Sequence, residues 1–217
     1  MKPFDLHTPG LFVTGTDTGV GKTVITSAIC HALREKGHRV GGFKPVASGC
    51  QRQDGRWVSE DARAIHHAIG EAFGETDVCP VRYDPAVAPA VAAEMLGEPF
   101  DWNAVREAIG RLDRDADRLV VEGAGGLLAP LDGPITVLEL IEAMALPVVV
   151  VCRPNLGTLN HTTMTVRLPR DRGCRVAGLI MNGGALHDSD TPDDSLATNR
   201  RWLERMCAAP VLAEVPR

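Results

Sequence analysis

The chain has 217 residues, of which 44% are hydrophobic and 24% charged, and its formal net charge is −5. This balance is typical of a globular protein and excludes a disordered chain. The negative charge argues against a general nucleic-acid binder, which would normally present a basic face. We therefore expect one domain spanning residues 1–217, large enough to bury a substantial core.

Neither a membrane span nor a signal peptide is expected. No apolar run approaches the roughly 18 residues that a span requires, and the N-terminus combines Lys2 with an early Asp5 and no long apolar segment. The six cysteines form no C-x-x-C pair, so we expect buried thiols rather than disulfides or metal ligands. A reducing cytoplasm fits this pattern.

The most informative stretch is Val-Thr-Gly-Thr-Asp-Thr-Gly-Val-Gly-Lys-Thr at residues 13–23. An apolar run, Leu11 to Val13, precedes it and predicts a strand. A helical pattern of apolar residues follows it: Val24, Ile25, Ala28, Ile29, Ala32 and Leu33. Strand, glycine-rich loop and helix are the parts of a phosphate-binding loop, whose backbone N–H groups hold phosphate oxygens. Lys22 would then reach the β- and γ-phosphates, and the Thr23 hydroxyl would bind Mg²⁺.

This stretch departs from the strict phosphate-loop pattern, because Thr16 stands where a glycine is expected and Gly15 lies one residue early. The alternative is an ordinary glycine-rich turn between a strand and a helix. The Gly-Lys-Thr ending and the strand–loop–helix context favour the nucleotide site.

The next strand, Val40 to Phe43, ends in Lys-Pro-Val-Ala-Ser-Gly at residues 44–49. Pro45 cannot continue a central strand, which puts Lys44 and Ser48 at its carboxyl edge, where open α/β sheets bind ligands. A solvated strand-end lysine is the alternative reading of Lys44. Residues 51–59 are polar and predict a mobile loop.

A helix is expected from Ser59, as its cap, to about Ile69. Asp61 is then either a first-turn acid favoured by the helix dipole or a metal ligand. Residues 74–88 read as a loop. Two further helices are expected over 90–96 and 102–112, the second capped by Asp101.

A buried strand at 118–121 leads into Glu122-Gly123-Ala124-Gly125-Gly126. An acid at the end of a hydrophobic strand suits a second Mg²⁺ contact beside a phosphate loop, and a plain turn is the alternative. A helix over 136–144 and a β-branched strand over 147–152 follow.

The last third of the chain predicts a helix from the loop at 153–161 to about Arg172, with an N-terminus able to hold an anion. Pro169 should kink or shorten this helix. A strand at 176–181, a polar loop at 184–195, a helix at 198–207 and a strand at 211–215 complete the pattern. Because strands and helices alternate throughout, we expect an α/β fold with a mostly parallel sheet covered on both faces.

Four stretches in this order and spacing (13–23, 44–49, Val-Glu-Gly-Ala-Gly-Gly at 121–126 and Leu-Gly-Thr-Leu-Asn-His at 156–161) resemble the dethiobiotin synthetase family. The resemblance runs from Phe12 to Pro216 and implies a P-loop NTPase-type fold. It implies ATP- and Mg²⁺-dependent ring closure of 7,8-diaminononanoate with CO₂ or bicarbonate, through a carbamate and a carbamic–phosphoric anhydride. It also implies a homodimer.

The resemblance implies roles for individual residues. Lys22 and Lys44 would stabilise charge during phosphoryl transfer, and Thr23, Asp61 and Glu122 would hold Mg²⁺. The ATP-binding residues would be Thr18, Gly19, Val20, Gly21, Lys22, Thr23, Asp61, Glu122, Gly123, Ala124, Gly125, Asn182 and Gly183, with Asn182 reading adenine. The diamine substrate would contact Thr18, Lys44 and Ser48, and its carboxylate would reach Gly157, Thr158 and Asn160 of the partner subunit.

The sequence departs from the family pattern in two places. Gly19 stands where some relatives carry an acid, and relatives commonly continue beyond Pro216 with a tail that covers adenine, so base selectivity is expected to be looser than phosphate binding. Two other functions remain open. One is another amide-forming synthetase, which would need an ammonia source. The other is a ParA/MinD-like ATPase switch, which would carry a lysine near Thr16.

Overall fold

The structure, a computed structural model, describes residues 1–185 and 193–216. Its centre is a six-stranded sheet in the order β12-β11-β10-β1-β7-β2, with every neighbouring pair parallel. The strands are β1 (Gly10–Gly15), β2 (Val40–Phe43), β7 (Arg118–Glu122), β10 (Val148–Cys152), β11 (Val176–Asn182) and β12 (Val211–Val215). The predicted mostly parallel α/β sheet is confirmed.

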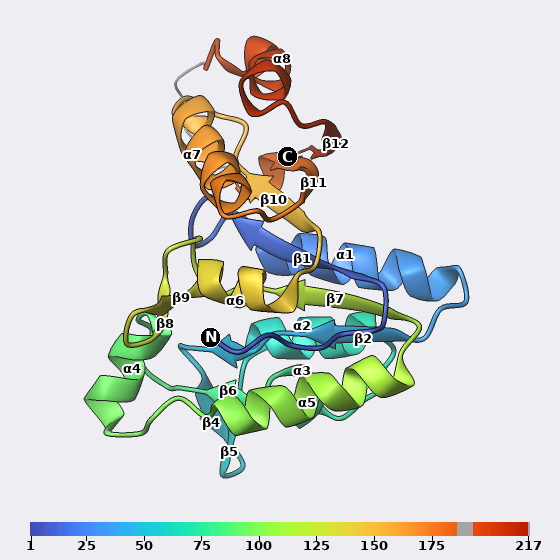
Figure 1. The fold of residues 1–217 in the computed structure, drawn as a ribbon, viewed down its shortest axis with the longest axis vertical. Helices are drawn as coiled ribbons and strands as arrows, with labels where there is room; N and C mark the ends of the chain where they lie inside the picture. Colours follow the sequence, from blue (N-terminus) through green and yellow to red (C-terminus); the bar gives the residue numbers. More distant parts are fainter. Residues whose placement is uncertain (186–192, 217) are drawn as a thin grey trace.

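Helices cover both faces of this sheet (Figure 1). The chain passes from β1 to β2 through α1 (Lys22–Glu35) and then crosses the sheet in the opposite direction, from β2 to β12. Right-handed crossovers therefore put the helices that lead directly into β7, β10, β11 and β12 on the other face. Helix α2 (Glu60–Ala68) packs beside α1. The opposite face carries α5 (Trp102–Asp115), α6 (Val137–Met144), α7 (Thr158–Asp171) and α8 (Leu196–Cys207). The remaining helical segments are α3 (Glu75–Val78), α4 (Pro89–Leu96) and a 3₁₀ turn at Gly183–Ala185.

The central strands are buried on both sides, which explains their continuous apolar sequences. All five residues of β10 are buried, and so are Phe12 and Val13 of β1. Because the sheet is parallel, the carboxyl ends of its strands meet at a single edge. The phosphate loop follows β1 at that edge, so the sheet order alone brings the loops after β2, β7, β10 and β11 to the same side.

Helix caps follow the sequence closely. Ser59 caps α2 by accepting a hydrogen bond from Ala62 N at 3.2 Å, and Asp101 caps α5 by accepting one from Ala104 N at 2.9 Å. Gly37 ends α1 with a left-handed φ of 86°. The predicted caps Ser59 and Asp101 are confirmed.

The prediction of a mobile loop at 51–59 is wrong. Strands β4 (Gln51–Gln53) and β5 (Arg56–Val58) form an antiparallel hairpin there. Asp54 and Gly55 both have positive φ, 49° and 78°, as a two-residue turn matched to the strand twist requires. The Asp-Gly pair was the available signal.

Several smaller expectations also need correction. Residues 74–88 contain α3 and β6 (Val81–Arg82), which pairs with β3 (Val46–Ala47), and a hairpin of β8 (Pro130–Asp132) and β9 (Ile135–Thr136) was not predicted. Pro169 does not shorten α7, which continues two residues beyond it to Asp171. The proline removes only the one hydrogen bond that its own N–H would donate within the helix.

The buried face of α1 also differs from the predicted one. Val24, Ala28 and Ala32 are exposed, whereas Thr26 and Cys30 are buried. Of the polar loop predicted at 184–195, residues 186–192 lie outside the described residues. In the part of the chain that is described, no helix is long and apolar enough to cross a membrane.

Candidate active site

A cavity of about 1040 Å³ lies at the carboxyl edge of the sheet. The phosphate loop, the segments after β2 and β7, the start of α2 and one side of α7 form its walls. The predicted site residues that line it are Thr18, Gly19, Gly21, Lys22, Thr23, Lys44, Ser48, Asp61, Glu122, Ala124 and Gly125. Three of the four sequence motifs therefore meet around one space. Val20 and Gly123 belong to the same loops without lining the cavity, and the Val20 side chain is fully buried.

The phosphate loop requires glycine at position 21. Gly21 has a φ of 88°, and a Cβ atom placed there would lie 2.0 Å from Asn182 Nδ2. Gly19 is also left-handed, at 71°. Left-handed residues alternating with ordinary ones turn successive N–H groups to one side of a loop, which is the geometry of an anion-binding nest.

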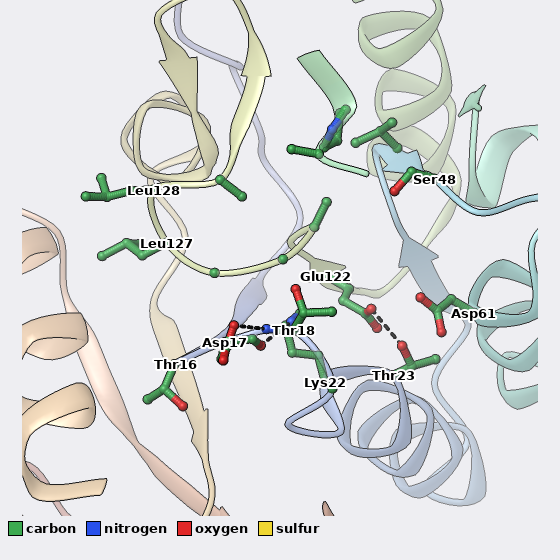
Figure 2. Close-up of a pocket in the computed structure, with 18 of the residues that line it drawn as sticks. Thr16, Asp17, Thr18, Lys22, Thr23, Ser48, Asp61, Glu122, Leu127 and Leu128 are labelled. Carbon is green, nitrogen blue, oxygen red and sulfur yellow. Dashed lines mark hydrogen bonds between the residues drawn. The ribbon is translucent and has the colours of Figure 1, made fainter. Parts of the chain in front are cut away.

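Lys22 is buried at the base of this loop, and its Nζ donates a hydrogen bond to Asp17 O at 2.9 Å. Burial lowers the pKa of Lys22 to about 8, an effect that the nearby Glu122 carboxylate partly opposes. A phosphate group beside this ammonium would favour its charged form. Lys22 is thus a cation held in the loop that carries the anion-binding N–H groups (Figure 2).

Lys44 is not a solvated strand-end residue. It is 4% exposed, and its Nζ lies 2.7 Å from Asp61 Oδ2 and 2.6 Å from Glu122 Oε1. Burial alone would lower the pKa of Lys44, but the two carboxylates outweigh burial and raise it above its usual value. In turn, Lys44 outweighs burial at Asp61 and lowers the pKa of that carboxyl. The cluster is an ion triad with one cation between two acids.

The residues predicted to hold Mg²⁺ converge. Figure 2 shows Thr23, Asp61 and Glu122 pointing toward one another, and Thr23 Oγ1 donates to Glu122 Oε1 at 2.8 Å. Glu122 is fully buried, and its Oε2 has no hydrogen-bond partner within the described residues. A hydroxyl and two carboxylates are the hard oxygen donors that Mg²⁺ prefers alongside substrate phosphates, so these side chains fit the ion. Within residues 1–185 and 193–216, no group of three or more His, Cys, Asp or Glu side chains is arranged so that it could hold a metal ion.

Two residues from neighbouring strand ends hold the outer side of the phosphate loop. Asn182, at the end of β11, donates from Nδ2 to Val20 O at 2.9 Å and accepts from Gly184 N at 3.2 Å. Gly183 begins the 3₁₀ turn directly after it. Arg153, just past β10, donates from Nη2 to Thr18 O at 3.3 Å. Arg153 was not predicted, although its place directly after a strand at this edge was the available signal.

The predicted carboxylate-binding residues lie at the start of α7, away from the lining of this cavity. Gly157 is exposed and left-handed, with a φ of 96°, and Asn160 is exposed. Thr158 is buried, and its hydroxyl lies 3.0 Å from that of Thr162. A surface-exposed helix start of this kind is open to contact from another molecule.

The walls of the cavity include apolar residues that sequence reasoning missed. Leu127 and Leu128 follow the Glu122 loop and lie on the opposite wall from Ser48 (Figure 2). The other apolar lining residues include Val46, Val87, Pro89, Met164 and Leu168. Such a wall suits a ligand with an aliphatic portion. No local motif marks these residues, because they meet only through the fold.

Comparison with known proteins agrees with this geometry. The sequence model of a family described as "AAA domain" matches residues 9–217. The ATP-dependent dethiobiotin synthetase BioD of Bacillus subtilis subsp. natto is 37% identical over 208 residues, which cover 96% of this chain and 87% of that protein. The BioD proteins of Xanthomonas campestris strain 8004 and Anoxybacillus flavithermus are 36% and 32% identical, each with 91% of its length covered.

The chain belongs to the ATP-dependent dethiobiotin synthetase family. The resemblance seen in the sequence motifs is thereby confirmed, and so is the expectation of an enzyme. Among solved structures, the cell division ATPase MinD of Pyrococcus furiosus matches with a TM-score of 0.50 at 19% identity, covering 97% of this chain and 84% of MinD. MinD from Pyrococcus horikoshii matches equally, at a TM-score of 0.50, with 97% of this chain and 82% of MinD covered. At this identity the MinD matches support the P-loop NTPase fold alone.

Proposed function

We propose that this protein is a dethiobiotin synthetase of biotin biosynthesis. It would close the cyclic urea of dethiobiotin from 7,8-diaminononanoate, CO₂ and ATP, releasing ADP and phosphate. The observation that carries the proposal is the convergence of two buried lysines, Lys22 and Lys44, from separate motifs on one cavity with Thr23, Asp61 and Glu122. Family membership supports it independently.

The chemistry accounts for the two lysines. One amine of the substrate adds to CO₂ and loses a proton, giving a carbamate. A carbamate oxygen attacks the γ-phosphorus of ATP, the bond to the bridging oxygen of ADP breaks, and a carbamic–phosphoric anhydride forms. The second amine then attacks the carbamoyl carbon, phosphate leaves with the bonding electron pair, and the amine gives up its proton as the ring closes.

Each protein group has a defined task in this sequence. The N–H groups of residues 18–23 and Lys22 bind and orient the phosphates, and Lys44 stabilises negative charge on the carbamate and the transferring phosphoryl group. Mg²⁺, held by Thr23, Asp61 and Glu122, would neutralise charge on the β- and γ-phosphates. Ser48 and Thr18 would contact the diamine, while Asn182 and Gly183 would lie toward adenine.

We further propose a homodimer in which the start of α7 of one subunit receives the carboxylate of the substrate bound to the other. The exposed Gly157 and Asn160 at a helix N-terminus support this, because such a position favours anions. Six free cysteines, five of them buried, fit the reducing cytoplasm that we propose as its location.

A ParA/MinD-like switch is the competing function, since MinD shares the fold. Thr16 stands where such a protein would carry an additional lysine. The test is phosphate release from Mg·ATP with 7,8-diaminononanoate and bicarbonate, omitting each component in turn. Release that requires both the diamine and the carbon source supports the synthetase. Release indifferent to the diamine would overturn it in favour of the switch.

A further inference from the structure

We infer that Arg153 is a positioning residue of the phosphate loop, which turns the N–H of Gly19 toward the nucleotide by holding the carbonyl of Thr18 on the other side. The inference rests on the proposed nucleotide site. It adds a residue to which neither the sequence motifs nor the comparisons assign a role.

The contact itself is between the guanidinium and the loop backbone. Nη2 of Arg153 donates to Thr18 O at 3.3 Å, and it lies 3.6 Å from the position that a Cβ on Gly19 would occupy. The guanidinium therefore packs directly against Gly19, where the loop has no side chain in the way. Arg153 is half-buried, and its Nε is buried without an acceptor among the described residues.

The geometry of the peptide bond means that this contact sets the direction of the Gly19 N–H. The described chain contains no cis peptide bond, so the Thr18 carbonyl and the Gly19 N–H, which share one peptide, point in opposite directions. Thr18 and Gly19 line the cavity, whereas Arg153 does not. With the carbonyl held toward Arg153, the Gly19 N–H faces the cavity.

Asn182 holds the carbonyl two residues further along the loop in the same way. Its Nδ2 donates to Val20 O, and Val20 does not line the cavity while Gly21 does. The two side chains therefore hold the carbonyls of residues 18 and 20 outward and leave the N–H groups of residues 19 and 21 for an anion. This is the alternation that an anion-binding nest needs.

Arg153 is itself held in place by its own loop. The next residue, Pro154, accepts a hydrogen bond at its carbonyl from Asn199 Nδ2 at 2.7 Å, and Asn199 is 2% exposed. The N–H of Leu156 donates to Asp193 Oδ2 at 2.8 Å. Because α8 and the residue Asp193 before it hold this backbone, the Arg153 guanidinium can restrain the phosphate loop. A guanidinium on an unrestrained segment would simply move together with the phosphate loop.

The test uses Arg153→Gln with Arg153→Lys as the conservative variant and Arg170→Gln as the matched control. Arg170 also donates to backbone carbonyls, those of Cys207 and Ala208, but away from the site. The sequence holds only two Thr-Gly pairs, 14–15 and 18–19. Labelling threonine with ¹³C at the carbonyl and glycine with ¹⁵N therefore leaves the amides of Gly15 and Gly19 alone in a carbonyl-filtered spectrum.

We expect Mg·AMP-PNP to move the Gly19 amide downfield in the wild type and in Arg170→Gln. In Arg153→Gln this shift should be much smaller and the Kd for Mg·AMP-PNP about tenfold higher, in line with losing one charge-assisted hydrogen bond. Arg153→Lys should show a Gly19 shift and a Kd between those of the wild type and those of Arg153→Gln. Thermal denaturation checks that lost stability is not the cause. If the denaturation midpoint falls equally in Arg153→Gln and Arg170→Gln, the weaker binding of Arg153→Gln alone comes from the loop contact.

An unchanged Gly19 shift and an unchanged Kd in Arg153→Gln would overturn the inference while the proposed function stands. Failure of the wild type to bind Mg·AMP-PNP would overturn the proposed function and the inference together. The two failures are thus distinguishable in a single set of samples.

Discussion

Lys44 Nζ lies 2.6 Å from Glu122 Oε1 in the interior of the protein. The lysine proposed to act on the substrate is therefore also the counter-ion of a carboxylate proposed to hold Mg²⁺. A buried carboxylate needs a cation beside it, because isolating its charge in a medium of low dielectric constant is costly. In the proposed function, Mg²⁺ at Glu122 would share this pairing and leave the Lys44 ammonium more available to an anionic substrate.

Replacing Lys44 should therefore affect stability as well as turnover. Because Lys44 pairs with the fully buried Glu122, we expect Lys44→Ala to lower the free energy of unfolding by about 3 kcal/mol. Turnover should fall by roughly a hundredfold or more. Urea unfolding and phosphate release measure the two effects.

The double variant Lys44→Met, Glu122→Gln separates the two roles. Removing both charges should restore most of the stability, while turnover stays low. Lys36→Ala, at an exposed lysine just after α1, is the matched control and should change neither quantity. Full stability of Lys44→Ala would contradict the ion triad.

Gly21→Ala should abolish nucleotide binding. A Cβ at this position would meet Asn182 Nδ2 at 2.0 Å, so either the loop must move or Asn182 must give up its hydrogen bond to Val20 O. Gly37→Ala is the control, since Gly37 has nearly the same φ of 86° but nothing within 4 Å. The control should lose about 1–2 kcal/mol of stability from backbone strain and keep its affinity for Mg·AMP-PNP by calorimetry. Normal affinity in Gly21→Ala would show that Asn182 does not fix the loop.

Thr136 and Glu139 form a capping box at the start of α6. Burial works against ionised Glu139, but hydrogen bonds from the Thr136 hydroxyl and amide outweigh it and lower the pKa of that carboxyl. A lowered folded pKa contributes stability above the unfolded value of about 4.3, and this is lost as pH falls through the folded pKa. Thr136→Ala should therefore cost about 1 kcal/mol at pH 7 and less at acid pH. Urea unfolding of the wild type and Thr136→Ala should show that their difference in free energy of unfolding becomes smaller toward acid pH. A difference that stays constant with pH would contradict the capping box.

The cysteines should react in order of their exposure. Burial raises the pKa of Cys30 and of Cys79 to about 12, and both are at most 1% exposed, whereas Cys174 is half-buried. Since only the thiolate reacts, a disulfide reagent should label Cys174 first in the native protein and all six cysteines in urea. Rapid native labelling of Cys79 would mean that the β3–β6 region opens.

The sequence was sufficient for the main architecture and for the residues of the phosphate loop. Strongly apolar strands such as Val148–Cys152, and caps such as Ser59 and Asp101, are local signals that survive folding. Glu122 ends β7, and Lys22 and Thr23 begin α1 directly after the loop that follows β1. A parallel sheet necessarily gathers the carboxyl ends of its strands, and the loops that follow them, at one edge. The location of the candidate site could therefore be predicted from the order of strands and loops along the chain.

What the sequence did not provide depends on contacts between distant residues. The burial of Lys44 between two carboxylates was not predicted, because nothing nearby in the chain indicates that Asp61 and Glu122 enclose it. Arg153 reaches the phosphate loop from the segment after β10. The wall residues Leu127 and Met164 take their places through packing of the loop after β7 and of α7 around the cavity. The Gln51–Val58 hairpin was missed because its strands are short and polar, although its Asp-Gly turn was visible.

The most direct test of the central claim is to supply ¹³C-labelled bicarbonate with 7,8-diaminononanoate and Mg·ATP and to measure the mass of the product. We expect a cyclic urea carrying one ¹³C atom, with one phosphate released for each molecule formed. Phosphate release with no ¹³C in any product derived from the diamine would contradict the proposed ring closure.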